Sequence, residues 1–154
     1  MKTTKNLMEK FLLGAIACLA LLRTNAGELT WQTDLPKALA TAKAENKAVL
    51  LDFTGSDWCG FCIKLHKEVF SKDEFAEFAK KNLVLVEVDF PHKKKLPADQ
   101  QKANDALQAK YKVNGFPTLV VLNADGKKLG EEVGYGGGGP TAVIGNLKKH
   151  LDKK

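Results

Sequence analysis

The chain has 154 residues, of which 44% are apolar and 27% are charged. These values describe a single globular domain and exclude a disordered chain. The formal net charge is +6, and residues 1–26 hold +3 of it, from four basic residues against one acidic residue. The remaining +3 makes only a mildly basic domain, so we expect no nucleic-acid partner.

Residues 1–26 have the pattern of a cleavable export signal. A lysine-bearing start precedes the apolar run "FLLGAIACLALL", and the small residues of "TNA" suit cleavage after Ala26. Twelve apolar residues are too few to cross a bilayer comfortably. The alternatives are an uncleaved anchor or lipid attachment at Cys18. We therefore predict a signal peptide over 1–26 and a mature domain over 27–154.

The mature chain begins with a helix and a buried strand. Pro36 suits a first helical turn, and the apolar spacing around it predicts a helix over 35–45. The apolar run "AVLLDF", residues 48–53, predicts a strand buried on both faces. A short helix is expected to follow over about 59–67.

In the middle of the chain, helices and strands are again predicted in turn. Ser71 and Glu74 have the spacing of a capping box, with Phe70 and Phe75 placed as its hydrophobic staple. They predict the start of the next helix. A second apolar strand is expected at "LVLVEVDF", followed by a helix at about 98–110.

A hairpin and a helix end the chain. The run "TLVVLN" predicts a strand, and "NADG" turns it into a partner strand over 128–133. A final helix is expected around Val143–Leu151. Strands and helices that first alternate and then close with a hairpin predict an α/β fold. Its central sheet would be mixed, with helices on both faces.

Two cysteines, Cys59 and Cys62, remain once the signal is removed. A bridge between them closes too short a loop to add much stability. Haem attachment requires a histidine directly after the second cysteine, where this chain has Ile63. A structural zinc site needs four ligands, and His66 would still leave one to be supplied by His92 or a carboxylate. We therefore expect no metal, with a metal-binding protein as the alternative.

Redox chemistry fits the pair better. The motif lies between a buried strand and a helix, which places Cys59 at a helix N-terminus, where backbone N–H groups favour a thiolate. That thiolate can attack a disulfide, and Cys62, one turn later, can resolve the mixed disulfide. We expect Cys59 to be the exposed nucleophile and Cys62 the shielded resolving thiol.

Several polar residues have a simpler interpretation. His66, His92 and His150 are expected to be ordinary surface histidines. The run Lys93–Lys95 is expected to be a solvated loop.

The motif resembles a known family. "WCGFC" after "VLLDF", with "GFPT" far downstream, is similar to the thioredoxin superfamily. "FTGSDWC", "VEVDFP" and "YKVNGFP" more closely resemble exported DsbH-type thioredoxin-like oxidoreductases of the bacterial periplasm. The resemblance covers about residues 30–152. It implies a thioredoxin-like fold and periplasmic thiol-disulfide exchange without a cofactor.

The resemblance also implies residue roles. Pro117 would be a cis-proline beside the sulfurs, and the backbone at Phe116 would pair with an extended substrate. Trp58 would flank the site, with simple core packing as the alternative. Asp52 resembles the buried acid that accepts a proton from the resolving thiol. The link "TGSD" after it is one residue longer than in ordinary thioredoxin, so a structural role stays open. Segment 91–97 also looks longer, either as a partner surface or as a variable loop.

The direction of electron flow depends on the residues between the cysteines. Gly60 and Phe61 carry no charge to stabilise the Cys59 thiolate, so only the helix terminus favours it. We expect a monomeric reductase with a potential nearer about −270 mV than about −120 mV. Its partners would be disulfide-containing exported proteins and a membrane thiol reductant. A disulfide isomerase, an oxidase or a non-catalytic binding protein remain alternatives.

Overall fold

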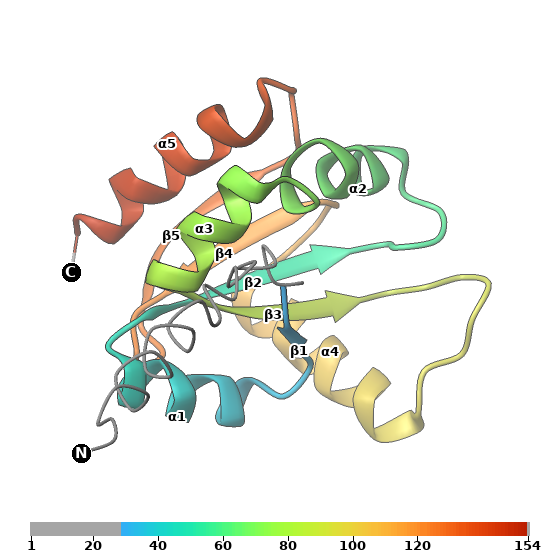
Figure 1. Ribbon diagram of the computed structural model, residues 1–154. Coiled ribbons are helices and arrows are strands. Elements are labelled where there is room, and N and C mark those ends of the chain that lie inside the picture. The colour runs from blue at the N-terminus through green and yellow to red at the C-terminus, as the bar shows by residue number, and fades with distance from the viewer. Residues whose placement is uncertain (1–28, 154) are drawn as a thin grey trace, which may run out of the picture.

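The computed structural model describes residues 29–153 (Figure 1). The expected signal peptide, with Cys18 and the cleavage point after Ala26, lies outside these residues. None of the helices between residues 29 and 153 is long and apolar enough to cross a membrane. The elements in chain order are β1 (Trp31–Gln32), α1 (Leu35–Glu45), β2 (Ala48–Thr54), α2 (Gly60–Leu65), the π-helical segment η1 (His66–Phe70), α3 (Asp73–Asn82), β3 (Leu83–Asp89), α4 (Ala98–Tyr111), β4 (Thr118–Leu122), β5 (Lys128–Val133) and α5 (Gly139–Leu151).

Five strands form one mixed sheet in the order β1-β3-β2-β4-β5. β3 pairs in parallel with β1 and β2, whereas β4 runs antiparallel to β2 and β5. The fold class predicted from the sequence is therefore confirmed. β1 was not predicted, because two residues are too few to show a period of two.

Helices cover both faces of the sheet (Figure 1). Alternate residues of β2 enter different clusters, as the pleat of a strand requires. Ala48 and Leu50 pack among residues of α2, α3 and α5, whereas Val49 and Leu51 pack among residues of α1 and α4. Every residue of β2 is buried, as expected for a strand covered on both sides.

The start of α3 differs from the prediction. α3 begins at Asp73, and the Ser71 hydroxyl donates to the carbonyl of Lys67 at 2.7 Å. The capping-box prediction is therefore wrong, because η1 continues the preceding helix as far as Phe70 and the hydroxyl bonds back to it. The two staple aromatics Phe70 and Phe75 do pack together, with ring centroids 4.9 Å apart.

Candidate active site

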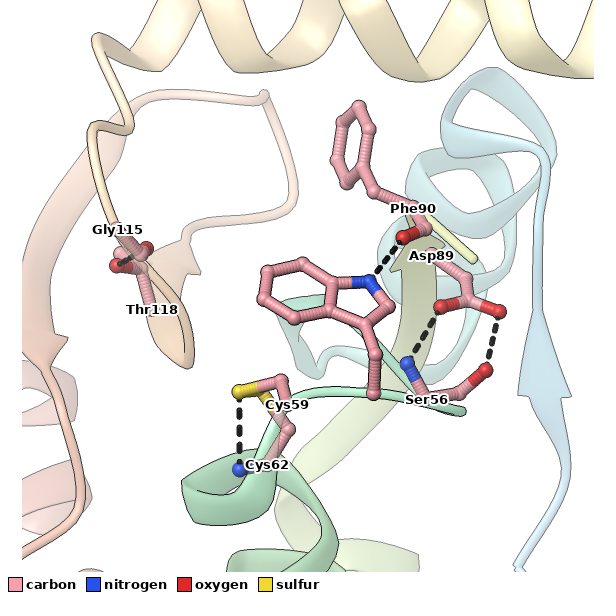
Figure 2. Close-up of a disulfide and its surroundings, with 8 residues drawn as sticks. Ser56, Cys59, Cys62, Asp89, Phe90, Gly115 and Thr118 are labelled. Atoms are coloured by element: carbon pink, nitrogen blue, oxygen red, sulfur yellow. Dashed lines mark hydrogen bonds between the residues drawn. A yellow bond between two sulfur atoms is a disulfide. The ribbon is translucent and has the colours of Figure 1, made fainter. Parts of the chain in front are cut away.

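Cys59 and Cys62 are joined by a disulfide where β2 leads into α2 (Figure 2). Cys59 is the N-cap of α2, and its sulfur accepts the Cys62 backbone N–H at 3.2 Å. The residues are 7% and 4% exposed, respectively. The expectation of an exposed Cys59 is therefore wrong for the disulfide form, because its sulfur is bonded to Cys62 and faces the end of the helix.

The loop before the disulfide is held by a network of hydrogen bonds. The backbone N–H of Cys59 donates to the carbonyl of Gly55 at 2.9 Å. Ser56 donates its backbone N–H and its hydroxyl to the two oxygens of Asp89, at 2.9 and 2.6 Å (Figure 2). The Trp58 indole lies over Gly55, where an added Cβ would come within 2.5 Å of Cε2. A glycine is therefore required at position 55 by this close approach.

Trp58 lies on the surface beside the disulfide. Its side chain ring is close to that of Phe116, with centroids 6.0 Å apart in an edge-to-face arrangement. Its Nε1–H donates to the carbonyl of Phe90 at 2.7 Å (Figure 2). The residue is 41% exposed, so the core-packing alternative is wrong. The indole can therefore contact a partner that approaches the disulfide.

The segment around Pro117 is close to this tryptophan. The Phe116–Pro117 peptide bond is cis, as the family resemblance implied. Pro117 is buried, Phe116 is half-buried, and the Pro117 carbonyl accepts the Gly134 N–H at 2.8 Å. The Thr118 hydroxyl donates to the carbonyl of Gly115, which braces the turn (Figure 2). The Phe116–Trp58 contact brings this segment and the cysteine motif to one site.

Asp52 lies on the face of the sheet that α2 covers, because it alternates along β2 with Ala48 and Leu50. It is buried, and its Oδ1 has no hydrogen-bond partner. Burial, and then the charges of Glu87 and Asp89, raise the pKa of Asp52 to about 8. Such a carboxyl group can exchange a proton near neutral pH.

Two further acids on β3 were not singled out from the sequence. Glu87 is the register partner of Asp52 on the neighbouring strand, and burial is the main cause that raises the pKa of its carboxyl group. Asp89 is buried, and Lys94 Nζ lies 3.0 Å from its Oδ2. Acids at alternate positions of the otherwise apolar "LVLVEVD" were the signal that could have identified them.

Three surface predictions need separate comment. Lys93–Lys95 are exposed, as predicted, and Lys94 also pairs with Asp89. His92 is exposed, as predicted, and its ring stacks on Trp58. His150 is half-buried, and its Nε2 lies 2.6 Å from a Glu132 carboxylate oxygen, so it is not an ordinary surface histidine.

His66 is exposed, as predicted. Within residues 29–153, no three side chains of His, Cys, Asp or Glu are placed to hold a metal ion.

Comparisons with known proteins agree with this geometry. A family model described as a thioredoxin-like domain matches residues 35–138. The chain is 42% identical over 126 residues to the disulfide bond reductase DsbH of Chlamydia pneumoniae, which covers 82% of this chain and 75% of that protein. A solved DsbH oxidoreductase matches with a TM-score of 0.77 and 39% identity, over 90% of this chain and 95% of that one. The chain is also 33% identical over 109 residues to the thiol:disulfide interchange protein DsbD 2 of Pseudomonas aeruginosa, across 68% of this chain and 17% of that protein.

Proposed function

Because the chain belongs to the thioredoxin-like family and is a thiol-disulfide oxidoreductase, we propose that it reduces disulfides of exported proteins in the periplasm. The observation that carries this proposal is the Cys59–Cys62 disulfide at the start of α2, beside the exposed Trp58. Two cysteines so placed can alternate between dithiol and disulfide without a cofactor.

The proposed reaction has two exchange steps. In the reduced protein, the Cys59 thiolate attacks one sulfur of the substrate disulfide, which breaks that bond, forms a mixed disulfide and releases one substrate thiolate. The Cys62 thiol passes its proton to Asp52, and the resulting thiolate attacks the Cys59 sulfur. The second substrate thiolate then leaves. Two electrons pass to the substrate, whose thiolates take protons from solvent, and the Cys59–Cys62 disulfide forms.

Asp52 suits this proton transfer for two reasons. It is on the sheet face that α2 covers, and its buried Oδ1 has no other hydrogen-bond partner. Its raised pKa makes the ionised form of Asp52 a stronger base than an exposed aspartate, so the fraction that is ionised near neutral pH can take the Cys62 proton. Its role is catalytic in this proposal.

The surface around the disulfide suits a polypeptide substrate. Of the described residues, the large apolar side chains that are exposed are Trp58, Phe61, Ile63 and Val133. Three of them lie within the cysteine motif or next to it, and Val133 precedes Gly134, which bonds to Pro117. We propose that Trp58, Phe116 and Pro117 bind an extended substrate segment by backbone pairing and apolar contact.

The reducing direction rests on the motif and on the relatives. Neither Gly60 nor Phe61 places a cation beside Cys59, so the thiolate gains only from the helix terminus. The DsbH relative is named a disulfide bond reductase. A reductase in an oxidising compartment needs electrons, and we propose a membrane thiol reductant as their source.

A redox titration tests the direction. The Cys59–Cys62 couple would be equilibrated with glutathione buffers, its free thiols alkylated and the products weighed by mass spectrometry. We expect a potential nearer about −270 mV than about −120 mV, together with catalysed reduction of insulin. A potential near the second value would favour an oxidase. Retained zinc and no disulfide formation would favour a binding protein.

A further inference from the structure

The loop 91–95 is fixed to the cysteine motif by one carboxylate. Asp57 Oδ1 accepts the backbone N–H of His92 at 2.9 Å. Its Oδ2 accepts the backbone N–H groups of Lys93 and Lys94, at 2.8 and 3.3 Å. These bonds, the one to His92 first, hold the pKa of Asp57 below its usual value. The carboxylate therefore stays ionised and keeps the loop in place at neutral pH.

An ion pair is the second interaction that holds the same loop. Lys94 Nζ pairs with buried Asp89, whose two oxygens also bind Ser56 of the motif loop. Of two adjacent residues in the motif loop, Ser56 thus bonds to the last residue of β3 and Asp57 bonds to the loop that follows it. The two segments therefore form a single braced structure.

This brace places His92 on the indole of Trp58. The two rings are parallel within 4°, and their centroids are 4.3 Å apart. The Trp58 ring also contacts the ring of Phe116 edge to face. Phe116 in turn stacks on Phe90, with ring centroids 5.2 Å apart. The indole is therefore held by His92, by its bond to Phe90 and by Phe116, while part of it remains exposed.

We propose that His92 and Asp57 are positioning residues that fix Trp58 as one wall of the substrate site, and that this wall makes the enzyme prefer disulfides within polypeptides to small-molecule disulfides. The inference rests on the proposed function. A wall that is rigid before binding lowers the entropy lost when an extended chain docks beside the sulfurs. A small disulfide presents too little surface to use the indole, so its exchange depends on the cysteines alone.

The test compares two substrates with the full-length protein and dithiothreitol as the electron source. His92→Ala should raise the KM for insulin about three- to tenfold, while kcat and the rate with hydroxyethyl disulfide stay within about twofold, because only the wall is lost. Asp57→Ala should act in the same direction. His92→Tyr, which keeps an aromatic ring, should restore the insulin KM. Lys95→Gln is the matched control at another exposed position of the same loop.

The outcomes separate the two proposals. Equal losses on insulin and hydroxyethyl disulfide in His92→Ala, or no change with either, would overturn the role of His92. A shift in the Cys59–Cys62 potential in this variant would also contradict it, since a wall for the substrate does not alter the redox couple. A wild-type protein that reduces neither disulfide would instead refute the proposed reductase.

Discussion

Asp52 and Glu87 lie directly beside each other on the parallel strands β2 and β3, on the face of the sheet covered by α2. Burial raises the pKa of both carboxyl groups, and the charge of Glu87 further raises that of Asp52. Two neighbouring acids in a buried position disfavour simultaneous ionisation. The Asp52–Glu87 pair therefore holds a proton at pH values where exposed acids have lost theirs.

This arrangement predicts that the stability of the oxidised protein falls as pH rises. The pKa of Asp52 is about 8 in the folded protein against an ordinary value of 3.8. Between these two values the folded state binds a proton that the unfolded state has released, so Asp52 adds no cost to the folded state below about pH 4 and its full destabilising cost by about pH 8. Asp52→Asn should remove this slope and raise the free energy of unfolding at pH 8 by several kcal/mol, because one pKa unit is about 1.4 kcal/mol.

Urea unfolding at pH 5, 7 and 8.5 measures this effect, with the exposed Asp105→Asn as the control. An Asp52→Asn protein that keeps the wild-type pH slope would show that other groups cause it.

The two thiols should behave differently when each is removed. Cys59→Ser should abolish insulin reduction, because no thiolate is left to attack. Cys62→Ser should still attack but should accumulate a mixed disulfide, because resolution is lost. Non-reducing electrophoresis and mass spectrometry would detect the adduct. Adduct formation through Cys62 in the Cys59→Ser protein would reverse the assignment.

The potential should respond to a cation placed between the cysteines. Phe61→His should lower the pKa of the Cys59 thiol and raise the potential by tens of millivolts, since about 30 mV corresponds to about 1.4 kcal/mol of added stability in the reduced form. Glutathione equilibria would measure the shift. Ile63→His, at an exposed position just after Cys62, serves as the control. No shift in Phe61→His would mean that residues outside the motif set the potential.

Gly55 should tolerate no side chain. Gly55→Ala would place a Cβ against the Trp58 indole, so we expect a loss of about 1–3 kcal/mol in unfolding free energy and a changed tryptophan emission spectrum. Gly60→Ala is the matched control, because an added Cβ there meets no atom within 4 Å. Equal stability of the two variants would contradict the close approach of the indole.

Export should leave a mature chain that begins at or near Gly27. The prediction rests on the charged start, the apolar run and the small residues before the expected cleavage point. N-terminal sequencing of protein recovered from the periplasmic fraction would test it. Intact Met1 on protein in the cytoplasmic fraction would count against export, and a lipid on Cys18 would support the alternative of lipid attachment.

The sequence by itself determined the fold class and the cysteine chemistry. The buried strand β2 follows from a continuous apolar run, and the closing hairpin follows from "NADG" between two strand patterns. The position of Cys59 at the start of α2 follows from the junction of such a run with a helix. These features depend on residues close together in the chain, where periodicity and spacing carry the information.

Only the tertiary structure decided how the site is assembled. Asp57 and His92 are 35 residues apart and are joined by a hydrogen bond that no local pattern encodes. Asp52 and Glu87 meet only because β2 and β3 pair in that register. Asp57 and His92 each resemble a surface residue within their own segments. The partner of each residue becomes known once the sheet brings distant segments together, because the burial and pairing of a side chain depend on the whole packed chain.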